Sequence, residues 1–149
     1  MQAVEQAAAF SKQVTLLASG ARTVGANATP VTGLGLYRAA MIMLDVTALA
    51  TDALDTLDVF IDTSPDGGTT WINAIHFTQL LGNGSAVKEW AELGGGAPAA
   101  TTTDVMADAA AGVVRPMRFT DRLRVRYAII DSGDANQSFT FSVKAYLKS

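Results

Sequence analysis

The feature that most restricts the fold of this chain is an alternation of apolar and polar residues with a period of two. In residues 121–131, four apolar residues alternate with three arginines: Leu123, Val125, Tyr127 and Ile129 against Arg122, Arg124 and Arg126. The same pattern runs through two more segments, with Phe139, Phe141, Val143, Ala145 and Leu147 in 137–148 and Leu57, Val59 and Ile61 in 55–64. Such alternation is typical of strands that have one buried face and one polar face.

Further strand-like segments extend this pattern along the chain, at residues 12–19, 35–47, 71–79 and 85–93. Turn-forming sequences separate them, among them "PVTGLG", "GNGS" and "DSGDANQ". The segment 35–47 is apolar on both faces, which indicates a central strand or one covered by a partner. We therefore predict an all-β chain, a single antiparallel β-sandwich or jelly roll of about seven or eight strands, with a closed barrel as the alternative.

Two segments fall outside the strand pattern and define the predicted organisation. Residues 1–11 are rich in alanine and glutamine and form an N-terminal arm, followed by the β-sandwich domain over 12–149. Residues 94–116 form a long loop of small residues within that domain. A loop of this length in a compact domain is usually functional or disordered. Its apolar residues indicate that it docks on another surface.

The segment "SPDGGTTW" (64–71) raises the question of an enzymatic motif. Its spacing S-x-D-x-G-x-x-W resembles the Asp-box of sialidases and related β-propellers, where the box recurs once per blade, at a hairpin turn. Here it occurs once. Asp66 can accept hydrogen bonds from the turn, and Gly67 and Gly68 permit positive φ. With Trp71 covering the turn, we predict a structural hairpin.

Other candidate sites also favour structural roles. His76 is the only histidine, and neither a nucleophile motif nor a metal-ligand spacing accompanies it. The acids Asp45, Asp52, Asp55, Asp58, Asp62 and Asp66 lack the spacing of a calcium loop and are interpreted as a solvated acidic face. We therefore expect no enzyme: no catalytic residues, no metal site and no cofactor.

Composition limits the partners. The chain is 49% apolar and 17% charged with a mean hydropathy of +0.23, which indicates an oligomer interface or a larger assembly. A net charge of −3 argues against nucleic-acid binding. The longest apolar run, 39–46, is too short to cross a membrane, and no cysteine is present.

Basic residues are concentrated near the C-terminus, where seven of the eleven lie beyond residue 114. Three of them form an arginine ladder, defined here as Arg122, Arg124 and Arg126. The ladder has two interpretations that the sequence leaves open. It is either a solvated face with cross-strand pairs to Asp58, Asp62 or Glu89, or a contact with another subunit.

The order of segments resembles a class of small structural proteins of tailed-bacteriophage virions. The resemblance rests on "VTLLASGART", "YRAAMIMLDVTAL", "LDVFIDTSPDGGTTW", "FTQLLGNGS", the arginine-alternating strand and "SFTFSVKAYLK", and it spans most of residues 12–148. It is closest to head decoration (cement) proteins. The resemblance implies a homotrimer that is assembled in the host cytoplasm, binds the outer capsid surface and clamps neighbouring subunits of the major capsid protein.

On this interpretation, the contacts with the capsid and between subunits involve the arm, the long loop and the arginine ladder: Phe10, Val105, Met106, Val113, Val114, Arg122, Arg124 and Arg126. A tail or head–tail connector protein belongs to the same structural class. A carbohydrate-binding module is the alternative from another class, with Trp71, Trp90, Tyr37 or Tyr146 stacking on sugar rings.

Overall fold

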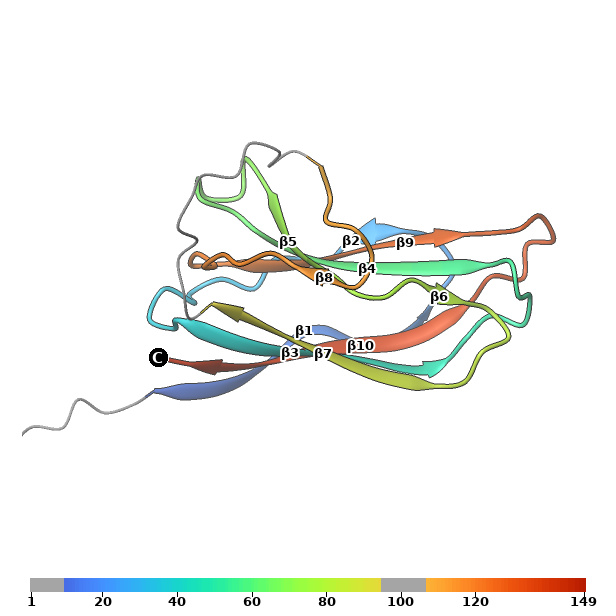
Figure 1. The fold of residues 1–149 in the computed structure, drawn as a ribbon, viewed down its shortest axis with the longest axis horizontal. Coiled ribbons are helices and arrows are strands. Elements are labelled where there is room, and N and C mark those ends of the chain that lie inside the picture. Colours follow the sequence, from blue (N-terminus) through green and yellow to red (C-terminus); the bar gives the residue numbers. More distant parts are fainter. Residues whose placement is uncertain (1–9, 95–106) are drawn as a thin grey trace, which may run out of the picture.

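The computed structural model describes residues 10–94 and 107–149, which form ten strands in two antiparallel sheets. Sheet A has the order β1-β10-β3-β7, with β1 (Ser11–Arg22), β10 (Phe139–Lys148), β3 (Ala39–Ala48) and β7 (Val87–Gly94). Sheet B has the order β2-β9-β4-β5-β8, with β2 (Ala26–Asn27), β9 (Leu123–Ile130), β4 (Thr56–Thr63), β5 (Ile72–His76) and β8 (Val113–Val114). The short β6 (Leu80–Leu81) pairs with β4. The sheets lie face to face as two layers (Figure 1).

The predicted all-β sandwich is confirmed. Seven of the ten strands have five or more residues, and each corresponds to one of the seven segments with a strand pattern. The other three strands, β2, β6 and β8, have two residues each, too few to show an alternation in the sequence. In the described residues there is no helix, and so none that is long and apolar enough to cross a membrane.

The strand order distinguishes a jelly roll from other sandwiches. Four pairs are nested inside one another along the chain: β1 with β10, β2 with β9, β3 with β7, and β4 with β5. The pairs alternate between the sheets, as they do when one long hairpin is rolled up into eight strands. β6 and β8 are additions to this plan. The first and last described residues lie side by side: Ser149 donates its backbone N–H to the carbonyl oxygen of Phe10 at 2.9 Å.

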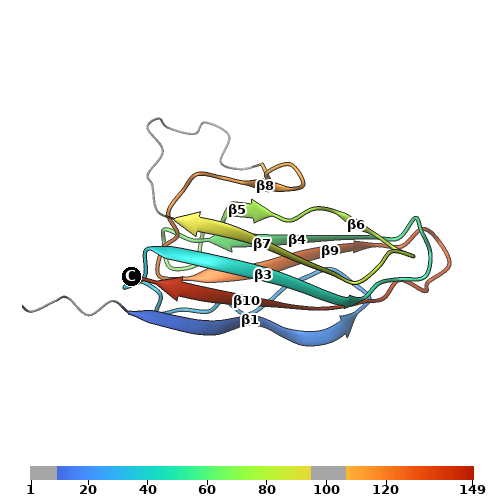
Figure 2. The same cartoon turned by 60° about the horizontal axis from the view of Figure 1, so that its bottom comes forward.

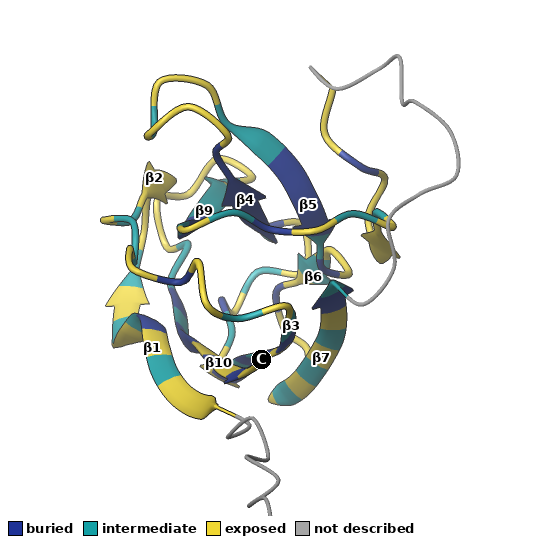
Figure 3. Cartoon of the chain, turned by 90° about the vertical axis from the view of Figure 1, so that its left-hand side faces the viewer, coloured by how far each residue is buried: buried dark blue, intermediate teal, exposed yellow. Residues whose placement is uncertain are grey.

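The core lies between the sheets, where the alternating apolar residues meet. All five residues predicted for the inner face of β10 are buried: Phe139, Phe141, Val143, Ala145 and Leu147. Leu123 and Val125 of β9 and Leu57, Val59 and Ile61 of β4 meet them from sheet B. Figure 3 colours the strands by burial: β5 is largely buried, whereas β1 at the edge of sheet A is largely exposed or intermediate.

The structure corrects the sequence prediction for β4 and confirms it for β3. β4 is buried on both faces, so the interpretation of its acids as a solvated face is wrong: Asp58 and Asp62 are buried, as is Asp55 just before the strand. β3 is central in its sheet, as predicted. However, no described element covers its outer face, and Met41 there is exposed.

The predicted turn at 64–71 connects β4 to β5 as a hairpin. The Ser64 hydroxyl oxygen accepts the Gly68 N–H at 2.8 Å, and an Asp66 oxygen accepts the Thr70 N–H at 2.7 Å. Gly67 and Gly68 have φ of 74° and 96°, backbone angles that residues with a side chain rarely adopt. The structural interpretation of this motif is confirmed.

The loop prediction needs a correction within the described residues. Residues 107–116 are held against the edge of sheet B, and Val113 and Val114 form β8, which pairs with β5. Ala109 donates its N–H to the Asn73 side chain at 2.9 Å. This pairing could not be predicted, because a strand of two residues is too short to show an alternation. Residues 1–9 and 95–106 lie outside the described residues.

Candidate functional site

The outer face of sheet A is the most unusual surface in the described part of the chain. The register of β10, β3 and β7 aligns its outward side chains in rows across the sheet. One row contains Tyr146, Met41 and Glu92, and the next contains Lys144, Met43 and Trp90. Figure 2 shows these strands in front, with no other strand over them.

The centre of this face is apolar and accessible. Trp90 is 65% exposed, Tyr146 is 47% exposed and Met41 is 45% exposed. A sheet face in contact with water normally has polar side chains, whereas tryptophan, tyrosine and methionine are enriched where proteins bind one another. Charged residues surround this centre: Lys144, Lys148, Glu92 and the Lys88–Asp45 pair at 3.6 Å. An apolar centre with a charged rim is the usual layout of a protein-binding surface.

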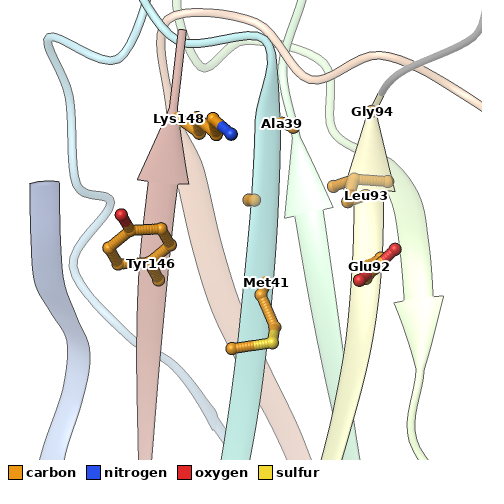
Figure 4. A pocket seen from close by; sticks show the side chains of 8 residues that line it. Ala39, Met41, Glu92, Leu93, Gly94, Tyr146 and Lys148 are labelled. Atoms are coloured by element: carbon orange, nitrogen blue, oxygen red, sulfur yellow. The ribbon is translucent and has the colours of Figure 1, made fainter. Parts of the chain in front are cut away.

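A shallow hollow of about 400 Å³ lies at one end of this face. Its walls come from Met41 of β3, Glu92 of β7, and Tyr146 and Lys148 of β10 (Figure 4). The small residue Ala39 forms part of the floor, next to Gly94 across the strand pair. The hollow is large enough to receive a protruding apolar side chain of a partner.

The second cluster of functional groups lies on the outer side of sheet B, where the arginine ladder meets Asp62. Arg124 lies directly opposite Asp62 in the register of β9 and β4, and its Nη2 is 2.8 Å from Oδ2. Arg126 Nε lies 3.0 Å from the same oxygen, and Arg126 also pairs with Asp108. Burial lowers the pKa of Arg126, but the hydrogen bonds that it donates to Asp62 and Asp108 outweigh this effect and raise that pKa above its ordinary value. This cluster is an intrachain ion network centred on the buried Asp62, with partly buried arginines and the exposed Asp108 around it.

The remaining arginine supports the hairpin turn. Arg122 donates to the carbonyl oxygen of Gly67 at 2.7 Å and pairs with Asp121 at 2.9 Å. Arg124 stacks on Trp71 at 4.2 Å, which joins the turn to the network. Of the three acids predicted as cross-strand partners, only Asp62 pairs with the ladder. Each ladder residue has a partner within the chain, and a role in a subunit contact stays a prediction.

His76 connects β5 to residues 107–116, the described end of the predicted long loop. Its Nε2 lies 2.7 Å from Asp58 Oδ1, and its Nδ1 lies 2.7 Å from the carbonyl oxygen of Ala109. Because a carbonyl oxygen only accepts, Nδ1 carries a proton. A histidine that activates a nucleophile needs one ring nitrogen free for it. Both nitrogens are engaged here, so His76, held by Asp58, fastens residues 107–116 to the sheet.

The other residues predicted for partner contacts are dispersed. Phe10 is exposed at the start of β1, while Val113 and Val114 are exposed on β8 at the edge of sheet B. Val105 and Met106 lie outside the described residues. The structure therefore does not bring the predicted set together, and the role of these residues stays a prediction.

The four aromatic residues considered for sugar binding separate into two pairs. Trp71 is occupied by Arg124, and Tyr37 packs against the core. Trp90 and Tyr146 share the outer face of sheet A. The sequence shows that 35–47 is apolar on both faces. Its position beside Trp90 and Tyr146 could not be predicted, because it depends on the pairing of strands that are distant in the sequence.

Comparison with protein-family models gives no match for the sequence, and comparison with curated proteins gives none. Comparison with solved structures finds a chain in the structure of infectious bursal disease virus, Gx strain, at 10% identity and a TM-score of 0.47. The match covers 94% of this chain and 32% of the viral one, so this chain spans about a third of its length. A similarity of this size carries no argument about function.

Proposed function

We propose that this chain is a non-enzymatic structural protein of a virion, a decoration protein that binds the outside of a phage capsid and stabilises it. The observation that carries the proposal is the outer face of sheet A, where Trp90, Tyr146 and Met41 are exposed together. The jelly-roll fold is compatible with this role but also serves lectins and enzymes, so the argument rests on the surface.

Such a face suits a protein that works by adding interface. Burial of apolar area stabilises an assembly by about 25 cal/mol per Å², less the entropy lost on association. The major capsid protein is the proposed partner, and Trp90 and Tyr146 are the proposed anchors. Aromatic anchors of this kind commonly contribute the largest part of the binding energy.

Binding to phage heads assembled without the protein tests the proposal. We expect saturable binding by the wild-type chain and at least a tenfold weaker affinity for Trp90→Ala, because an anchor truncation costs about 2 kcal/mol or more. Val24→Ala is the matched control, since Val24 is also exposed but lies outside this face. Equal binding by all three proteins would contradict the assignment of the face.

The N-terminal arm has a separate expected role. Removing residues 1–9 leaves β1 intact, since that strand begins at Ser11. We expect this shortened chain to stay folded and to occupy heads more weakly. Unchanged occupancy would mean that the arm makes no contact with the capsid.

Self-association is the second part of the proposal. We propose a homotrimer, and light scattering over a dilution series measures its mass directly. A stable trimer supports the decoration role. A ring of six or more subunits would instead favour a tail or connector protein.

A carbohydrate-binding module is the second candidate, favoured by the exposure of Trp90 and Tyr146 on one face. Aromatic rings on a flat sheet surface can stack on sugars. A glycan array distinguishes the two candidates. Glycan binding that is lost in Trp90→Ala, without binding to heads, would favour the module.

A further inference from the structure

Three carboxylates converge at one end of the sandwich, from two connections that are far apart in the sequence. Asp55 precedes β4, whereas Asp131 and Asp134 lie in the loop between β9 and β10. One oxygen from each residue lies within 4.8 Å of the others. At this end, on the right of Figure 1, the connection from β3 to β4 runs beside the connection from β9 to β10.

Asp55 is the unusual member of this cluster. It is 0% exposed, and its Oδ1 accepts the backbone N–H of Ser132 at 2.8 Å. Its Oδ2 is buried and has no hydrogen-bond partner among the described residues. A buried carboxylate oxygen without a partner is strongly unfavourable, and proteins satisfy such atoms by pairing or by coordinating a metal.

The surroundings offer no compensating charge. Within residues 10–94 and 107–149, no lysine or arginine forms an ion pair with Asp55, Asp131 or Asp134. Three carboxylates this close repel one another unless a cation or a proton lies between them. In the same loop, the side-chain oxygen of Gln137 is also buried without a partner.

The chemistry of these groups selects among cations. All the available atoms are oxygens, which hard cations prefer. Calcium accepts six to eight oxygens at about 2.3–2.6 Å in irregular arrangements, so it can bridge oxygens up to about 5 Å apart. Magnesium requires about 2.0–2.1 Å and an octahedral geometry. An irregular set of one carboxylate before a strand and two from a loop, with oxygens within 4.8 Å of one another, suits the ion with the less strict geometry, calcium.

We propose that Asp55, Asp131 and Asp134 bind one calcium ion, which ties the β3–β4 connection to the β9–β10 loop. Both connections cross from one sheet to the other, so the ion holds the two layers together at this end. Asp55 supplies a buried ligand fixed by Ser132, and Asp134 supplies an exposed ligand from the loop. This site could not be predicted from the sequence, because Asp55 and Asp131 lie in connections that are far apart along the chain.

Calorimetric titration with calcium chloride, paired with thermal unfolding in calcium and in EDTA, tests the site. We expect one calcium per chain and, at a hundredfold excess over Kd, a rise in Tm of about 5 °C or more. In Asp134→Asn, the affinity falls at least tenfold. Asp121→Asn is the matched control, because it removes one exposed carboxylate that lies outside the cluster, just before β9, and keeps the wild-type response.

Asp55→Asn separates calcium binding from a protonated acid cluster. The amide keeps an oxygen to accept from Ser132 but removes the buried charge. If calcium binds, this variant loses the calcium-dependent rise in Tm. A wild-type chain with no binding heat and no change in Tm at 10 mM calcium would overturn the proposal, as would an equal stabilisation by magnesium at the same concentration.

Discussion

At the scale of single residues, Asp62 is the charge on which the arginine network depends. It is 1% exposed and pairs with Arg124 and Arg126 at once. Asp62→Ala leaves two partly buried guanidinium groups without their shared acid. Since removal of one partner from a buried ion pair costs about 3–5 kcal/mol, we expect that loss in the free energy of unfolding, measured with urea.

Asp121→Ala is the control for this experiment. Asp121 also pairs with an arginine, but it is exposed, and exposed pairs contribute little. We expect a much smaller loss of stability. Similar losses for the two variants would show that Asp62 acts only as a surface charge.

Asp66 gives the turn a defined response to pH. Its hydrogen bond from the Thr70 backbone, followed by that from the Thr70 side chain, lowers the pKa of Asp66 below its ordinary value. Because the folded-state pKa is below the unfolded one, the contribution is complete at pH above the unfolded value of about 3.9 and is lost as pH falls through the folded value. We expect an NMR titration that follows the chemical shift of the Asp66 carboxyl carbon to show this lowered pKa.

The comparison with Asp66→Asn completes this prediction. The variant removes the titrating group, so stability between pH 5 and pH 2 should fall less steeply than in the wild-type chain. Unfolding in urea at each pH measures both slopes. Parallel slopes would mean that Asp66 has the same pKa in both states.

Sequence reasoning at the residue scale succeeded where the partners are near in sequence. The roles of Asp66, Gly67 and Gly68 followed from residues within the same turn. Asp62 was one of three acids predicted as partners of the arginine ladder, but the sequence could not assign it to Arg124, because the two lie 62 residues apart and the register between β9 and β4 decides the match. For the same reason, the contact of His76 with Ala109 was not predicted.

At the scale of elements, the connection from β3 to β4 depends on a close backbone approach at Gly82. A Cβ atom at this position would lie 1.8 Å from the carbonyl oxygen of Asp52 and 3.1 Å from that of Ala50. Backbone atoms cannot move aside as a flexible side chain can. We expect Gly82→Ala to destabilise the fold by about 2 kcal/mol or more in urea unfolding, as overpacking does.

Gly20→Ala in β1 provides the comparison. There the nearest atoms belong to the Arg22 side chain at 3.7 Å, which is ordinary contact distance. The added methyl group also reduces the entropy of the unfolded chain, so the variant should be neutral or slightly stabilised. A loss in Gly20→Ala equal to that in Gly82→Ala would contradict the close-approach explanation.

A strand could be predicted from the sequence only where its alternation of apolar and polar residues extends over several positions. Strands such as β9 and β10 show four or five alternations, which no other structure explains. The outer face of β4 is covered by ion pairs and by the segment 107–116. Its burial was missed because, in the sequence, acidic residues that pair within the chain cannot be told from acidic residues that face water.

At the scale of the whole molecule, the nested strand pairs make the two sheets interdependent. β1 pairs with β10 across the full length of the chain, and Ser11 lies opposite Lys148. Apart from the β4–β5 hairpin and the short β6 and β8, every connection between consecutive strands crosses from one sheet to the other. Neither sheet is therefore a continuous segment that can fold alone, which follows from topology and could not be predicted from the alternation.

We expect a single cooperative unfolding transition as a result. The slowest-exchanging amides of β10 in sheet A and of β4 in sheet B should report the same opening free energy, equal to that from urea unfolding, because both strands open only when the whole sandwich does. Refolding should take milliseconds to seconds, since most strand pairs join distant residues. Native-state hydrogen exchange measures both strands in one experiment. A lower opening free energy for β4 than for β10 would show that sheet B opens while sheet A stays folded, and the nested pairing would then not control stability.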